Sequence, residues 1–115
     1  MNPRPWLTNG QERLREFAER HDLVVEDVER LHGFVRRLEI DPLDILASTD
    51  HVGERHSRLG PSATVAGRVL VCSYRIDVPH RSVEVVSFSL PPGRDRPTYS
   101  AFEAPIVSRV LALAR

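Results

Sequence analysis

The sequence contains no lysine: all 16 of its basic residues are arginines, and 16 acidic residues balance them, so the formal net charge is zero. A balanced chain has no overall field that would favour nucleic acid or an anionic membrane, so any such partner needs a local patch. The missing lysine is best explained by the codon bias of a GC-rich genome. It nevertheless leaves the chain with planar guanidinium groups that suit phosphate and carboxylate.

Cysteine and long apolar runs are also scarce. Cys72 stands alone in an apolar stretch, which predicts a buried thiol and excludes a disulfide framework or a cysteine-rich metal site. No apolar run approaches a membrane span, and the first ten residues lack the apolar core of a signal peptide. We therefore expect a soluble, cytoplasmic protein without a membrane partner. At 115 residues, we expect a single domain over residues 1–115.

Two stretches near the N-terminus have the apolar spacing of amphipathic helices. Thr8 and Gln11 stand at capping-box spacing ahead of the first. The second covers residues 24–38 and should end before Asp41 and Pro42, because the residue before a proline disfavours helix. The apolar positions that define the first helix are Leu14, Phe17 and Ala18.

The most strongly patterned stretch runs from residue 67 to residue 90. Branched and aromatic residues favour strands over 68–76 and 83–90, with turn chemistry between them. Alternation along the first strand places Leu70, Cys72, Tyr74 and Ile76 on one face, and Val69, Val71, Ser73 and Arg75 on the other. The hairpin should lie centrally in an antiparallel sheet and pack on at least one helix, because its apolar face needs cover.

The remaining segments have weaker patterns. Residues 42–49 are compatible with a short strand, and 49–62 read as a polar loop that has room for an edge strand. Residues 104–115 predict a C-terminal helix with Pro105 in its first turn. The predicted fold class is α+β: a small antiparallel sheet packed against two N-terminal helices, with a C-terminal helix.

Several kinds of site find no support. The chain has no glycine-rich phosphate loop. His51 and His56 lie near Asp50 and Glu54, a set that can in principle bind a metal ion, but the spacing matches no metal motif and a solvated polar loop is the favoured interpretation. We expect no metal site and no cofactor. Two strand serines, Ser73 and Ser87, lack a nucleophile elbow and are interpreted as packing or hydrogen-bonding residues.

What remains is a set of arginines and histidines with a tyrosine near the sheet. Metal-free RNA cleavage needs a base, an acid and cations that stabilise the phosphate charge, and these residue types can fill those roles. Their order along the chain resembles that of the BrnT toxins, small ribonucleases of the RelE-like group. The matching positions are Trp6, His21, Asp41-Pro42-Leu43, Glu54-Arg55, Gly67-Arg68 and Tyr99.

The chain departs from this family in three ways. Phe88 and Ser89 stand where the family's late strand has an alanine and an arginine, and the lysine near the family's first helix is missing. The segment between Trp6 and His21 is also longer by about one helical turn. These departures make reduced or lost nuclease activity credible unless another arginine takes over.

The resemblance implies a metal-independent endoribonuclease toxin of a type II toxin–antitoxin system, acting on RNA. A cognate antitoxin would cover its site, as a hetero-oligomer or beside a homodimer. The catalytic residues would be His21, Arg75, Arg81 and Tyr99, and the RNA-binding residues Glu54, Arg55, Arg68 and Arg94.

Other interpretations stay open. The chain is alternatively a non-catalytic interaction module with a toxin-like fold that binds a protein partner through its sheet or C-terminal helix, or a mobile-element inhibitor. His21 then serves as a helix C-terminal cation, Arg75 and Arg81 keep strand edges soluble, and Tyr99 anchors a loop.

Overall fold

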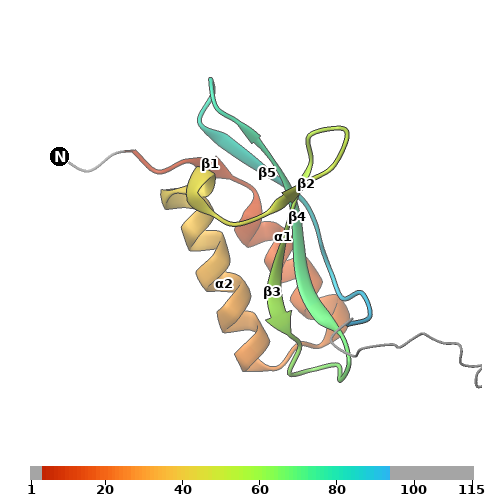
Figure 1. The fold of residues 1–115 in the computed structure, drawn as a ribbon. Helices are drawn as coiled ribbons and strands as arrows, with labels where there is room; N and C mark the ends of the chain where they lie inside the picture. Colours follow the sequence, from red (N-terminus) through yellow and green to blue (C-terminus); the bar gives the residue numbers. More distant parts are fainter. Residues whose placement is uncertain (1–3, 94–115) are drawn as a thin grey trace, which may run out of the picture.

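Two helices pack on one face of a five-stranded sheet in the computed structural model, which describes residues 4–93 (Figure 1). The expected α+β class is therefore confirmed for this part of the chain, while the expected C-terminal helix lies outside the described residues. The helices are α1 (Gly10–His21) and α2 (Val25–Ile40), followed by a short 3-10 helix, η1 (Pro42–Asp44). The strands are β1 (Leu7–Thr8), β2 (Ser48–Thr49), β3 (Arg55–Pro61), β4 (Val69–Asp77) and β5 (Ser82–Ser89).

The sheet is mixed, which corrects the expectation of a purely antiparallel one. Its strand order is β1-β5-β4-β3-β2, and β1 runs parallel to β5 while the other pairs are antiparallel. A parallel neighbour requires a long crossover, and here the chain passes through both helices between β1 and the rest of the sheet. Asn9 extends this pairing, because its side chain donates to the Val85 carbonyl (3.2 Å) and accepts from the Val85 amide (2.7 Å).

The predicted central hairpin is confirmed as β4 and β5. Leu70, Cys72 and Tyr74 have no exposed surface and pack in the core cluster with residues of both helices. Burial raises the pKa of the Cys72 thiol, as expected for an inert core cysteine. Arg75 lies exposed on the opposite face, so the predicted alternation of this strand is correct.

Both helices form close to their predicted bounds, but the capping box does not. The α1 N-cap is Asn9, whose side chain makes no capping bond. Thr8 accepts from the Gly10 amide at 3.1 Å, and the Gln11 side chain contacts the His32 ring at 3.2 Å. Thr8 is recruited into β1, where it pairs with Val83, and this places it outside the helix end.

A buried carboxylate ties α2 to the loop between β3 and β4. Asp27 has no exposed surface. It accepts hydrogen bonds from the Ser62 hydroxyl (2.7 Å), the Ala63 amide (2.8 Å) and the Thr64 amide (3.1 Å). These donors compensate for burying the charge. The contact fixes the N-terminal end of α2 against this loop.

The polar stretch after η1 contains the alternative edge strand, now β3. The short strand expected over residues 42–49 forms only at Ser48–Thr49. Because β2 pairs only with the first two residues of β3, most of the outer edge of β3 has no strand beside it among the described residues. No helix within residues 4–93 is long and apolar enough to cross a membrane.

Candidate functional site

The face of the sheet that points away from α1 and α2 carries a polar cluster. Side chains of β3 and β4 alternate, so His56 and Ser73 share this face and stand directly opposite each other in the strand pairing. Within residues 4–93 no helix covers it (Figure 1). Among the described residues, this face of the sheet is therefore uncovered, and we call it the open face.

The tight turn between β2 and β3 presents an aspartate to this cluster. The Asp50 amide donates to the Glu54 carbonyl at 2.9 Å, and Gly53 adopts a φ of +86°, a conformation that favours glycine. Asp50 Oδ1 accepts from the amides of Val52 (3.0 Å) and Glu54 (2.9 Å). One carboxylate oxygen is thus held by the turn, which leaves Oδ2 free to face the sheet.

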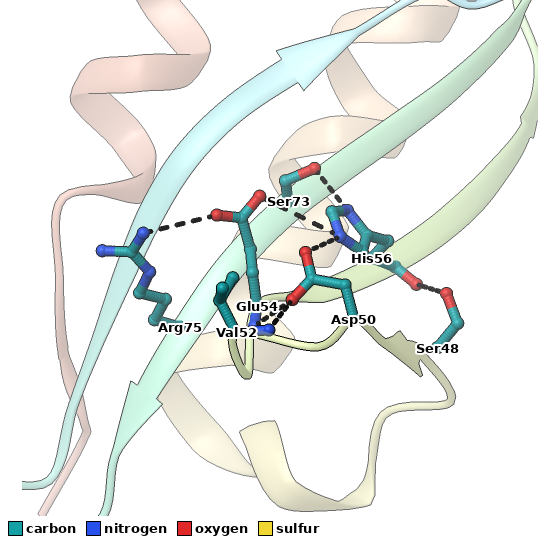
Figure 2. A network of polar contacts seen from close by, with 7 residues as sticks. All are labelled: Ser48, Asp50, Val52, Glu54, His56, Ser73 and Arg75. Carbon is teal, nitrogen blue, oxygen red and sulfur yellow. Dashed lines mark hydrogen bonds and ion pairs between the residues drawn. The ribbon is translucent and has the colours of Figure 1, made fainter.

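His56 lies between a hydroxyl and this carboxylate, as Figure 2 shows. Its Nδ1 is 2.8 Å from Ser73 Oγ, and its Nε2 is 3.1 Å from Asp50 Oδ2 and 4.0 Å from Glu54 Oε2. When the ring is neutral, these partners fit the tautomer in which the Ser73 hydroxyl donates to Nδ1 and Nε2–H donates to Asp50. The result is a chain from hydroxyl through imidazole to carboxylate.

The same contact affects the ionisation of Asp50. The hydrogen bond from His56 is the largest cause that lowers the pKa of Asp50, and the amides of Glu54 and Val52 add to it against a desolvation effect of opposite sign. Asp50 is therefore ionised at neutral pH. An ionised carboxylate on one side of an imidazole stabilises the imidazolium that forms when the ring accepts a proton.

The order of groups resembles a nucleophilic triad, but the setting favours acid–base chemistry instead. Ser73 is 8% exposed and lies inside β4, where it pairs with both neighbouring strands. An acyl-transfer site needs amide donors aimed at a developing oxyanion, and the amides of a central strand are committed to its neighbours. The cluster is better suited to moving a proton than to forming a covalent intermediate.

Arg75 borders the cluster as part of an ion-pair network. Its guanidinium lies 3.6 Å from Glu54 Oε1 and 3.9 Å from Glu84 Oε1 (Figure 2 shows the first contact). The sequence nominated Glu54 and Arg75 as site residues, and the structure brings these two together. The charge of Arg75 is shared between two carboxylates in the free protein.

A basic pocket lies at the other end of β3 and β4. Its volume is about 390 Å³, and no acidic residue lines it. Arg68, nominated from the sequence, lines it and donates to the Leu90 carbonyl at 3.0 Å. Arg58 also lines it, and stands on the same strand as His56, two residues along and therefore on the same face. The other lining residues are Gly60, Pro61, Gly67, Val69 and Gly93.

The other nominated residues do not join the cluster. Arg55 faces the core side, donating to the Ile45 carbonyl at 3.3 Å, with its guanidinium 6.0 Å from the centre of the Tyr74 ring. His21 ends α1 and its ring contacts that of Phe17 in a tilted arrangement, with 4.5 Å between ring centres. Arg55 precedes His56 on β3 and therefore points to the other face, and His21 lies on α1, on the far side of the sheet from the cluster.

Arg81 is at the turn between β4 and β5. Its guanidinium lies 4.8 Å from the centre of the Trp6 ring and donates to the Arg4 carbonyl. β4 spans nine residues, so Arg68 and Arg81 are separated by about 30 Å along the sheet. A single substrate phosphate cannot contact both. Arg94 and Tyr99 lie outside the described residues.

Asp50, His56 and Ser73 are not among the site residues nominated from the sequence: the first two lie in a stretch interpreted as a solvated polar loop, and Ser73 was interpreted as a packing or hydrogen-bonding residue. The signal available was the alternation of Glu54, His56 and Arg58, which places all three on one face once the segment is read as a strand. This alternation has no meaning in a loop, and the segment was interpreted mainly as a loop.

Comparison of the chain with protein-family models, with curated proteins and with solved structures finds no match.

Proposed function

We propose that the protein is a metal-independent endoribonuclease toxin of the kind its sequence resembles, with His56 as the group that accepts the proton. The observation that carries the proposal is the imidazole of His56, held between Ser73 and Asp50 on the accessible face of the sheet. Two N-terminal helices behind a small sheet agree with the RelE-like fold that the resemblance implies. The same resemblance implies RNA as substrate and an antitoxin that covers the site.

The proposed reaction uses the 2′-hydroxyl of RNA as the nucleophile. His56 Nδ1 takes the 2′ proton as the Ser73 hydroxyl turns away, and Asp50 stabilises the imidazolium through Nε2. The 2′-oxygen bonds to phosphorus while the bond to the 5′-oxygen breaks, giving a 2′,3′-cyclic phosphate and a 5′-hydroxyl. The leaving oxygen needs a proton from an acid, and Tyr99 remains the candidate from the sequence.

The basic pocket supplies the phosphate contacts. Arg58 is two residues from His56 on the same face, about 7 Å along the strand, a spacing close to that between adjacent RNA phosphates. Arg58 and Arg68 both line the pocket, and neither forms an ion pair with another described residue. A guanidinium without a carboxylate partner can bind phosphate without first breaking an ion pair.

A second candidate function is supported by one observation. Three carboxylates, Asp50, Glu54 and Glu84, share the open face with the arginines. A surface of mixed charge suits a protein partner better than it suits a polyanion. The alternative is therefore a non-catalytic module that binds a protein through this face.

An RNA cleavage assay tests the proposal. We expect the purified protein to cut a labelled RNA in the presence of EDTA and to leave 2′,3′-cyclic phosphate ends. His56→Ala should slow cleavage by about 10²- to 10⁴-fold, the usual contribution of a general base. His80→Ala is the matched control, because His80 also contacts an aspartate (Asp77, 2.8 Å) but lies in the β4–β5 turn, away from the cluster.

Two results would overturn the proposal: no cleavage by folded wild type at any RNA concentration tested, or unchanged cleavage by His56→Ala. In the first case, capture of a small protein by wild type that Glu84→Arg abolishes would support the interaction module. Induced expression gives a parallel readout, since an active toxin should arrest bacterial growth and His56→Ala should relieve the arrest.

A further inference from the structure

The residues around His56 also have the arrangement of a cation site. Asp50, Glu54 and His56 each offer one ligand atom, and these three atoms lie within 4.8 Å of one another. Two of the separations are 3.1 Å and 4.0 Å, measured from His56 Nε2 to Asp50 Oδ2 and to Glu54 Oε2. Ligands about 2.1 Å from a tetrahedral zinc ion stand about 3.4 Å apart. Side-chain shifts of about 1 Å would therefore satisfy the ion.

Each of the three ligands has its other polar atom already held. Asp50 Oδ1 accepts two amide hydrogen bonds from the β2–β3 turn, and Glu54 Oε1 faces Arg75 at 3.6 Å. His56 Nδ1 faces the Ser73 hydroxyl at 2.8 Å. Partners of this kind orient metal ligands in known sites. The atoms left over are the three that converge.

Ser73 suits both states of the imidazole. In a neutral ring without an ion, the Ser73 hydroxyl can donate to Nδ1 while Nε2–H donates to Asp50. A metal ion needs the Nε2 lone pair, so the ring proton moves to Nδ1, and the same hydroxyl then accepts it. The tautomer can therefore change without leaving an unpaired group in this half-buried cluster.

We infer that Asp50, Glu54 and His56 bind a divalent first-row transition-metal ion, such as Zn²⁺, with an open position toward solvent. Two carboxylates offset the charge of the ion, and the imidazole nitrogen favours Zn²⁺ over Mg²⁺. The side chains of His56 and Asp50 are each 32% exposed, so the ion can enter from solvent. This inference goes beyond the proposed nuclease and does not depend on it. The two uses of His56 exclude each other, because a ring with the ion on Nε2 carries its proton on Nδ1 and cannot accept the 2′ proton, so the proposed cleavage belongs to the metal-free chain.

Calorimetric titration of the untagged full chain with Zn²⁺ tests the inference. We expect one ion per chain and much weaker binding of Mg²⁺. His56→Ala should weaken Zn²⁺ binding by more than about 100-fold, because loss of a partner behind a ligand already costs about 10- to 100-fold. His80→Ala, which removes a histidine–aspartate pair without a third ligand, should bind like wild type.

Ser73 is tested as a positioning residue. Ser73→Ala should weaken Zn²⁺ binding by about 10-fold or more, and Ser73→Thr, which keeps the hydroxyl, should restore it. Co²⁺ provides a spectroscopic check, since its visible absorption should appear with wild type and disappear with His56→Ala. If His56→Ala does not fold, Glu54→Gln takes its place.

Failure to bind Zn²⁺, or equal loss of binding in His56→Ala and His80→Ala, would overturn the inference. Neither result affects the cleavage assay, which is run in EDTA. Conversely, a chain that binds Zn²⁺ at His56 and cuts no RNA would retain the metal site and lose the nuclease.

Discussion

The two faces of the sheet contrast most clearly at Ser73 and Tyr74, adjacent residues that point in opposite directions. The Tyr74 ring is fully buried, meets Phe34 edge-on with 5.9 Å between ring centres, and bonds to Ser57 through its hydroxyl at 3.0 Å. Ser73 instead contacts the His56 ring on the open face. One face stabilises the fold by packing against the helices, and the other carries the polar side chains of the candidate site. Substitutions should therefore separate stability from function.

The largest loss of stability should come from the inner face. Leu70→Ala removes a side chain with no exposed surface, and we expect the free energy of unfolding to fall by about 2–5 kcal/mol. Val71→Ala, one residue along on the outer face, is the control and should cost much less. Urea denaturation of both variants measures the difference, and equal losses would show that the two faces do not differ in packing.

Asp27 on α2 offers a second way to lower the free energy of unfolding from the helix side of the sheet. Asp27→Ala leaves the amides of Ala63 and Thr64 without their acceptor, which should cost about 2–4 kcal/mol. Its exposed neighbour Glu26 provides the control, since Glu26→Ala removes a carboxylate from the same helical turn. Denaturation of the two variants gives the comparison, and similar stabilities would contradict the role assigned to Asp27.

The pH dependence should follow from the same carboxylate. Burial raises the pKa of Asp27, but hydrogen bonds from Ala63, Ser62 and Thr64 outweigh it and lower the pKa below 3.8. A pKa lower in the folded state means stability that is present above about pH 4 and lost as the pH falls through the folded-state pKa. Thermal melts from pH 7 to pH 2 should show a steeper loss in wild type than in Asp27→Asn. Parallel curves would contradict this.

The smallest effect on stability is expected at the open face. Ser73→Ala removes one hydrogen bond to His56 and should cost about 1 kcal/mol or less. The same variant should change the behaviour of the His56 imidazole, seen as a shift of its ring ¹⁵N signals. A loss of several kcal/mol, or ring signals identical to those of wild type, would erase the proposed contrast between the faces.

The spacing of apolar residues was sufficient to predict α1, α2 and the inner face of β4, because residues that pack in the core recur at regular intervals along a helix or a strand. They did not predict β1, whose two residues gain strand structure only from β5 and from the Asn9 side chain. The polar cluster around His56 could not be predicted from these patterns. Ser73 meets His56 only because β3 and β4 pair in one particular register, and register depends on tertiary contacts.

The nominated arginines show the same limit. Residue type indicated that arginines could bind phosphate, but it did not indicate where they lie. Strand alternation places Arg55 on the core side of the sheet, and the length of β4 separates Arg68 from Arg81. Arg58, absent from the predicted set, stands beside His56 because it is two residues away on one strand. Its position could have been derived once β3 was treated as a strand.

RNA binding to the open face is tested by a titration followed by ¹H–¹⁵N spectra, with a 2′-O-methyl RNA that binds but lacks the nucleophile for cleavage. We expect that, at low salt, the signals that change belong to the open face and the basic pocket: His56, Arg58, Arg68 and Ser73. Signals of the α2 residues packed against the inner face should stay in place. Changes confined to the helices, or no changes at any RNA concentration, would contradict the claim that this face of the sheet is where RNA is bound and cut.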